Sequence, residues 1–333
     1  MTFIRLLALS VITALTVNGC QLQNRPASPP VKKDLTKDDI EQMMTDLSNW
    51  NRWGPDDELG ALNLITPAKR RAAAQLVRDG VSISLAHNVI KEAVDSSPPF
   101  NHTMRSTGES PSSSSTGDVF SVEYHGFTQT HVDALCHLFH KGKMYNGYPQ
   151  TLVTKEGAGK LSVVAMKDGI FTRGVLMDIP RLLGKEYLEG DRAIYPEDLE
   201  AWEEKAGMRV QSGDAVLIRT GRWTRRAETG TWEMMQNSAG LHVSCVPWLK
   251  ARDVAVIGSD LALDVMPSGI DGFPLPVHWV MIIAMGVPIL DNLDFETVSA
   301  AASERGRFTF LLTVAPLAVD GGTGSPINPI ATF

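Results

Sequence analysis

Hydrophobic and polar positions along the chain follow two different periods, which predicts a mixture of helices and strands. In residues 38–47 apolar side chains recur every three or four positions, the spacing of a short amphipathic helix. A second helix is predicted over residues 66–77, because Thr66 can cap its first turn and Pro67 lacks only a donor that this turn leaves unused. Residues 81–85 alternate apolar and polar side chains, as a half-buried strand does.

The pattern continues to the C-terminus and predicts one α/β domain over residues 38–333. Strands and helices alternate without an internal repeat, and 43% hydrophobic against 21% charged residues provide enough apolar surface for a sizeable core. The serine-rich residues 106–117 predict a mobile surface loop, for which a plain loop is a better explanation than a lid. Further strands are predicted at residues 119–128, 174–178, 215–219, 254–258 and 308–314, and further helices at 196–206 and 277–285.

The N-terminus has the pattern of an export signal. Residues 1–19 contain one early arginine, a short apolar stretch and a small residue just before Cys20. Residues 17–20 resemble the bacterial lipobox, in which cleavage leaves a lipid-modified cysteine at the new N-terminus, and residues 20–37 predict a flexible tether. We therefore expect an exported protein of the bacterial periplasm or cell envelope, anchored to a membrane only through Cys20. An ordinary signal peptide or an uncleaved anchor is the alternative.

Composition excludes several classes of partner and site. The chain has 31 basic and 38 acidic residues, a net charge of -7, and no basic stripe that would follow a nucleic acid. Its three cysteines are too few for a disulfide framework and too far apart for a zinc knuckle. Cys136 is better explained as a buried structural cysteine than as a nucleophile. A small-molecule substrate is the expected partner.

Four histidines and an aspartate lie within residues 125–140 and form the densest cluster of ligand-type side chains. On an extended strand, residues of equal parity share a face, so one face would present His125, Gln129, His131 and Asp133. Imidazole and carboxylate ligands together suit a divalent metal such as zinc or manganese, which would activate a water molecule. His137 could then shuttle the proton. The alternative is a set of core histidines satisfied by hydrogen bonds.

The same segment resembles the signature HxGTHxDxPxH of the cyclase family of metal-dependent hydrolases, which includes bacterial kynurenine formamidase and isatin hydrolase. Thr130, His131, Asp133 and His137 match its threonine, second histidine, aspartate and last histidine. Residues 53–63 and 321–331 resemble the beginning and the end of the larger bacterial members. The resemblance implies a swivelling β/β/α fold and a homo-oligomer.

The resemblance also implies a second, distant part of the metal centre. His278 and Asp291 match a histidine and a downstream acid of the family, with aspartate where glutamate is usual. The chain departs from the pattern at Phe127, where the family has its first metal histidine, and at Gln129, where larger members often have a histidine. The implied metal ligands are therefore His131, Asp133, His278 and Asp291, together with His125 or Gln129, and the implied general acid/base is His137.

Two functions of different classes follow from these residues. The first is a metal-dependent hydrolase, arylformamidase-like, that cleaves a C-N or C-O bond of a small amide, lactam, lactone or ester through metal-activated water. An N-formyl aromatic amine or a cyclic imide-like ring is its expected substrate by analogy. The second is a catalytically degenerate, membrane-tethered binding lipoprotein, which the residues at positions 127 and 129 make plausible. A purely structural envelope lipoprotein would have neither metal nor pocket.

Overall fold

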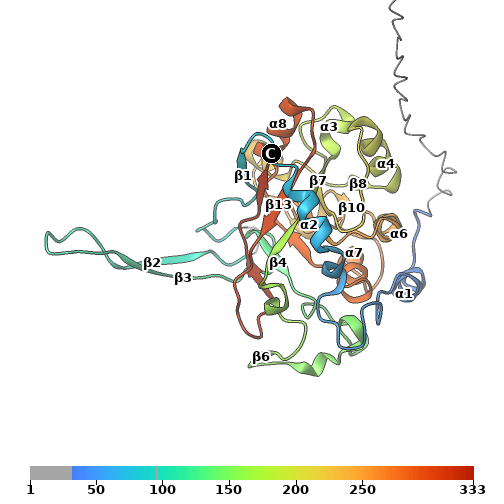
Figure 1. Cartoon of the computed structure of the whole chain (residues 1–333), viewed down its shortest axis with the longest axis horizontal. Helices are drawn as coiled ribbons and strands as arrows, with labels where there is room; N and C mark the ends of the chain where they lie inside the picture. Colours follow the sequence, from blue (N-terminus) through green and yellow to red (C-terminus); the bar gives the residue numbers. More distant parts are fainter. Residues whose placement is uncertain (1–31, 95–96) are drawn as a thin grey trace, which may run out of the picture. The chain divides into compact units, whose positions relative to one another are not determined.

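A nine-stranded mixed sheet forms the centre of the molecule (Figure 1). The computed structural model describes residues 32–94 and 97–333, and Lys32–Phe333 form one compact unit. The predicted signal at residues 1–19 and Cys20 lie outside the described residues. Within the described part, no helix has the length and apolar character needed to cross a membrane.

The strand order of the sheet is β1-β15-β13-β7-β9-β11-β12-β4-β14. The four central strands β7, β9, β11 and β12 are mutually parallel, and β4 is antiparallel to both β12 and β14. The strands of this sheet are β1 (Ser82–Ser84), β4 (His131–Asp133), β7 (Ile170–Asp178), β9 (Ala215–Arg219), β11 (Val256–Ser259), β12 (Ile289–Asp291), β13 (Thr309–Val314), β14 (Gly324–Pro326) and β15 (Ile330–Thr332). Three small two-stranded sheets consist of β2 (Asn101–Ser106) with β3 (Gly117–Ser121), β5 (Val153–Thr154) with β6 (Gly157–Ala158), and β8 (Ala193–Ile194) with β10 (Gly240–Leu241).

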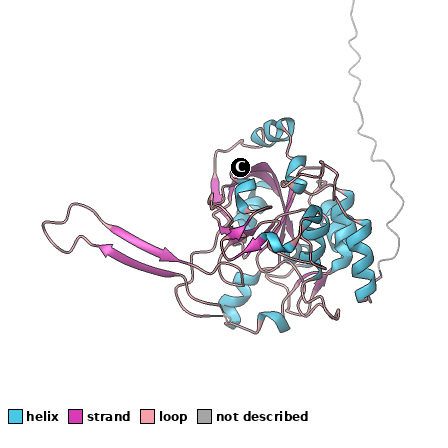
Figure 2. Cartoon of the chain, turned by 90° about the horizontal axis from the view of Figure 1, so that it is seen from below, coloured by secondary structure: helices cyan, strands magenta, loops and turns pink. Residues whose placement is uncertain are grey.

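Helices pack against this sheet, and in Figure 2 most of them lie on the side away from the β2–β3 hairpin. Helix α2 contacts β7 and β13, and α4 also contacts β7. The helices are α1 (Lys37–Asp46), α2 (Pro67–Ala74), α3 (Ile179–Leu183), α4 (Pro196–Lys205), α5 (Arg222–Thr229), α6 (Val246–Ala251), α7 (Pro276–Trp279) and α8 (Glu296–Arg305). A π-helical turn, η7 (Val280–Ala284), continues α7, and the 3-10 turns are η1 (Gly60–Leu64), η2 (Tyr145–Gly147), η3 (Gln150–Leu152), η4 (Val163–Met166), η5 (Met234–Gln236) and η6 (Val243–Cys245).

Local signals in the sequence placed several of these elements correctly. Thr36 and Asp39 form a reciprocal capping box at the start of α1, and the Thr66 side chain accepts from the Lys69 amide at the start of α2. The predicted strand at residues 215–219 coincides with β9. The mixed α/β fold class is confirmed.

Two expectations about the segment before the sheet core have different outcomes. The serine-rich segment is a surface loop as predicted, and it connects β2, which ends at Ser106, to β3, which begins at Gly117, so that the loop is the tip of a β-hairpin. The strand predicted at residues 119–128 ends at Ser121, and the next strand, β4, begins only at His131. Both views show the hairpin projecting from the body of the molecule (Figures 1 and 2).

Candidate metal centre

Strand β4 brings two ligand-type side chains next to a third on β12. His131 and Asp133 have equal parity and share a face of β4, while Val132 between them is fully buried in the core. In the antiparallel register His131 lies opposite Asp291, the last residue of β12. Sheet pairing therefore joins two parts of the sequence that are far apart.

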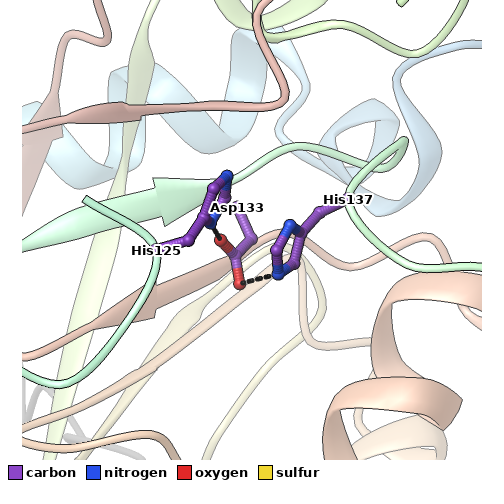
Figure 3. A group of neighbouring side chains, drawn as sticks. All are labelled: His125, Asp133 and His137. Carbon is purple, nitrogen blue, oxygen red and sulfur yellow. Dashed lines mark ion pairs between the residues drawn. The ribbon is translucent and has the colours of Figure 1, made fainter. Parts of the chain in front are cut away.

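Asp133 is the centre of the cluster (Figure 3). Its Oδ1 atom lies 2.9 Å from His125 Nδ1 and 3.4 Å from His131 Nε2, and its Oδ2 atom lies 3.9 Å from His137 Nε2. The rings of His125 and His137 stack with centroids 3.9 Å apart. Two sets of ligand atoms, each within 4.8 Å of one another, share Asp133: His125, Asp133 and His137, and His131, Asp133 and Asp291.

Unpaired buried atoms show that these residues fit a cation. His125 Nδ1, Asp133 Oδ1 and Asp291 Oδ1 are buried and have no hydrogen-bond partner in the part of the chain that the structure describes. The first two are 2.9 Å apart without the alignment of a hydrogen bond. Buried polar atoms are rarely left without a partner, and nitrogen and carboxylate oxygen are donors that zinc and manganese accept.

Charges within the cluster shift the pKa values of its members in different directions. Burial would raise the pKa of Asp133, but the surrounding imidazoles, His137 first, hold it well below its usual range. Burial would lower the pKa of His131, but the hydrogen bond and the charge of Asp133 raise it. Burial lowers the pKa of His137 to about 4, so its imidazole is neutral at pH 7.

Neighbouring groups orient the two histidines on either side of Asp133. His131 Nδ1 donates to the Gln129 carbonyl oxygen at 2.8 Å, which leaves Nε2 as the nitrogen that faces Asp133. His125 Nε2 lies 3.0 Å from the Thr323 hydroxyl, which leaves Nδ1 towards Asp133. Thr323 belongs to the C-terminal segment with family resemblance, so that segment helps to build the site.

His278 is held between two carboxylates. Its Nδ1 atom lies 2.7 Å from Asp264 Oδ2 and its Nε2 atom lies 3.1 Å from Asp291 Oδ2. Burial would lower the pKa of His278, but the carboxylates of Asp291 and Asp264 outweigh it and raise the pKa. His278 belongs to neither set of ligand atoms among the described residues, and its contacts suit an orienting partner of Asp291. Its role as a ligand stays a prediction.

Sequence reasoning missed Asp264, because this residue lies far in the sequence from the helix α7 whose first turn it caps. The Asp264 carboxylate accepts the backbone amides of Val277 at 2.7 Å and His278 at 3.2 Å, as a carboxylate at a helix N-terminus does. An aspartate within reach of the predicted helix start could have suggested this contact, but 13 residues separate it from Val277.

The extended strand that was expected to align His125, Gln129 and His131 does not exist. His125 reaches Asp133 from a loop, because the carbonyls of residues 126, 127 and 129 are bonded to side chains instead of a neighbouring strand. The Gln129 amide nitrogen donates to the Ile90 carbonyl oxygen at 3.2 Å. This contact does not favour Gln129 as a ligand, and its role stays a prediction.

Phe127 and Cys136 have the buried, apolar surroundings of residues with a structural role. The Phe127 side chain packs against a small buried cluster of Met234, Leu261, Ala262 and Met266. Cys136 is fully buried, and burial raises the pKa of its thiol to about 12, which is unsuitable for a nucleophile.

The sequence of the chain matches a known protein family. The family model Cyclase ("Putative cyclase") matches residues 69–264, more than half of the chain. The chain belongs to the Cyclase family. The matched region of this cyclase-family protein contains His125, His131, Asp133 and His137, whereas His278 and Asp291 lie beyond it. No curated protein matches significantly.

Solved structures give the same family and fold for this cyclase-family protein. A structure described as a novel cyclase is 31% identical, with a TM-score of 0.77, and the match covers 86% of this chain and 100% of that one. Isatin hydrolase A from Labrenzia aggregata, bound to benzyl benzoate, is 20% identical over 78% of this chain and 94% of that one, with a TM-score of 0.58. Isatin hydrolase A from Ralstonia solanacearum is 21% identical over 80% of this chain and 97% of that one, with a TM-score of 0.55. The isatin hydrolases therefore share its fold.

Proposed function

We propose that this protein is a metal-dependent hydrolase that cleaves a C-N or C-O bond of a small amide, lactam, lactone or ester. The observation that carries the proposal is the pair of ligand sets that share the buried Asp133, one with His125 and His137 and one with His131 and Asp291. The residues of these sets would hold a divalent cation, zinc or manganese. Such a cation lowers the pKa of water and polarises a carbonyl group.

The surrounding residues supply positioning and proton transfer. His137 lies beside Asp133, with its Nε2 atom 3.9 Å from Oδ2, and a quarter of its side chain is exposed, so its position suits the transfer of a proton between water and the leaving group. Thr323 and the Gln129 carbonyl oxygen orient His125 and His131. Asp264 holds His278, which in turn contacts Asp291.

An aromatic N-formyl amine or a cyclic imide-like ring is the substrate class that we propose to test first. Support comes from the family membership and from the fold shared with the isatin hydrolases. Fold alone does not choose a substrate, so lactones and esters belong in the same panel.

The experiment compares chelator-treated protein with protein reloaded with zinc or manganese, for metal content and for hydrolysis of formyl anilides, lactams, lactones and esters. We expect hydrolysis only after reloading, and loss of both metal and activity in His131→Ala. His102→Ala is the matched control, because His102 contacts Asp118 at 2.8 Å on the hairpin, away from the cluster. Hydrolysis that persists in metal-free protein would overturn the proposal, and bound metal without turnover on any substrate would favour the degenerate binding protein.

Export and a lipid anchor at Cys20 remain a separate proposal, supported by the sequence pattern of residues 1–20. Full-length protein expressed in a bacterium should fractionate with membranes, and Cys20→Ser should release it or leave its signal uncleaved. Cys136→Ser is the control, because Cys136 is buried in the folded domain. Soluble wild-type protein in the cytoplasmic fraction would contradict this proposal.

A further inference from the structure

Asn292 directly follows Asp291 and connects it to the loop that carries the histidines. Its side-chain nitrogen donates to the carbonyl oxygens of Gly126 at 2.7 Å and Gln129 at 3.1 Å. In return, the Thr130 hydroxyl donates to the Asn292 carbonyl oxygen at 2.7 Å. One residue therefore bonds β12 to three positions of the loop between His125 and His131.

The Gln129 carbonyl oxygen links Asn292 to His131, a candidate metal ligand. It accepts Nδ1–H of His131 at 2.8 Å and the amide of Asn292 at 3.1 Å. Two donors fix the direction of this carbonyl group, and the carbonyl group fixes the ring of His131. The Gly126 carbonyl oxygen, bonded to Asn292, adjoins His125 in the chain.

A buried arginine determines which way the Asn292 amide faces. Arg222 Nη1 donates to Asn292 Oδ1 at 2.7 Å, and Arg222 Nη2 donates to the Phe127 carbonyl oxygen. The amide oxygen is therefore on the arginine side and the amide nitrogen on the loop side. Asn292 and Arg222 are 0% and 2% exposed, so water cannot readily replace a lost partner.

We propose that Asn292 is a positioning residue that sets the distances of His125 and His131 from Asp133 and thereby the affinity of the site for a divalent cation. The inference rests on the proposed metal-dependent function. It assigns to Asn292 a role that a purely structural hydrogen bond would not have, because its loss would weaken cation binding more than it weakens folding.

The chain offers a control at Asn146 that shares the backbone conformation and the donor pattern of Asn292. Both asparagines have left-handed backbones, with φ of 55° at Asn292 and 57° at Asn146. The Asn146 amide also donates to backbone carbonyls, those of Gly54 at 3.0 Å and Pro55 at 3.1 Å, but on a different loop. Glycine adopts this φ without strain, so Asn→Gly at either position removes the side-chain bonds and keeps the backbone.

The experiment titrates chelator-treated wild type, Asn292→Gly and Asn146→Gly with Mn²⁺ by calorimetry, and records thermal unfolding of each without added metal. We expect the Kd for Mn²⁺ to rise about 10- to 100-fold in Asn292→Gly, as for other residues that orient metal ligands. Asn146→Gly should lower the unfolding temperature to a smaller extent, because Asn146 is only half-buried, and should leave the Kd within about twofold of wild type, since it does not touch the site.

Asn292→Asp provides a second variant that keeps the side-chain size but replaces the donor nitrogen with an acceptor oxygen. It should weaken Mn²⁺ binding like Asn292→Gly, and it decides the question if the glycine variant does not fold. Unchanged Kd in a folded Asn292 variant, or an equal loss in Asn146→Gly, overturns the inference. Wild-type protein that binds no Mn²⁺ or Zn²⁺ instead refutes the proposed function.

Discussion

Position 127 is a phenylalanine where the family signature has its first metal histidine. The side chain and the backbone carbonyl of Phe127 have separate roles. The side chain packs against Met234, Leu261 and Met266, whereas the carbonyl oxygen accepts a hydrogen bond from Arg222. The side chain therefore packs in a small apolar cluster and offers no metal ligand in place of the histidine. His125, two residues earlier, supplies the imidazole beside Asp133.

This arrangement predicts that Phe127→His does not restore a stronger metal site. The new imidazole would replace apolar packing, and we expect the free energy of unfolding to fall by about 1–3 kcal/mol. The Kd for Mn²⁺ should stay within about threefold of wild type, since His125 remains in place. Calorimetry and thermal unfolding measure both quantities. A variant that binds Mn²⁺ tenfold more tightly would show that the side chain at 127 reaches the cluster.

At the scale of elements, a buried carboxylate joins α4 to the end of α6. Glu203 on α4 accepts from Arg252 Nη2 at 2.9 Å, from Arg209 Nη1 at 2.7 Å and from the Val210 amide at 2.8 Å. Burial would raise the pKa of Glu203, but these hydrogen bonds, that of Arg252 first, lower it below its ordinary value of 4.5. A carboxylate with a lowered pKa in the folded state stabilises the fold while it is ionised.

The sign of this effect predicts how stability depends on pH. The contribution of Glu203 is fully present above pH 4.5, the pKa expected in the unfolded chain, and is lost as pH falls through the lower pKa of the folded state. At pH 7 Glu203→Gln should reduce the free energy of unfolding by about 1.5–3 kcal/mol.

Denaturant unfolding of wild type and Glu203→Gln between pH 7 and pH 3 tests this prediction. The difference between the two proteins should shrink below pH 4.5. Glu204→Gln, on the exposed side of the same helix, should follow wild type at every pH. A difference that grows on acidification would mean that the pKa of Glu203 is raised instead.

At the scale of the whole molecule, the β2–β3 hairpin extends from the body (Figure 1), and several of its apolar side chains are exposed. Met104 and Val119 are each 48% exposed and Phe120 is 57% exposed. An isolated two-stranded hairpin is marginally stable in water, so a packing partner would stabilise this one. The resemblance to homo-oligomeric cyclase-family members makes a second copy of the chain the partner that we expect.

Replacing residues 103–119 by an Asn-Gly turn should therefore lower the molar mass measured by light scattering to that of one chain. The shortened hairpin keeps its base, and the main sheet does not include β2 or β3. Phe120→Ser should weaken association in the same direction, whereas Leu317→Ser, an exposed apolar residue outside the hairpin, should not. A multimer that survives the deletion, or a monomeric wild type, would contradict the expectation.

The sequence by itself determined the local elements and the chemical nature of the site. The cap at Thr66 and the apolar run of β9 are local, so they predicted their elements within a few residues. The matching residues Thr130, His131, Asp133 and His137 indicated the family and the kind of metal centre before any geometry was known. The kinds of ligand and acid/base group that a site can contain are given by the residue types, so they can be identified from the sequence.

Only the tertiary structure decided which of these groups meet. Asp291 comes to His131 through strand pairing across 160 residues of sequence, and His125 comes to Asp133 through a loop held by Asn292 and Arg222. Period-two alternation assumes that a neighbouring strand bonds the backbone, whereas here side chains bond the backbone carbonyls before His131 and strand β4 begins only at His131. Contacts between distant segments depend on packing and register, which no short window of sequence contains.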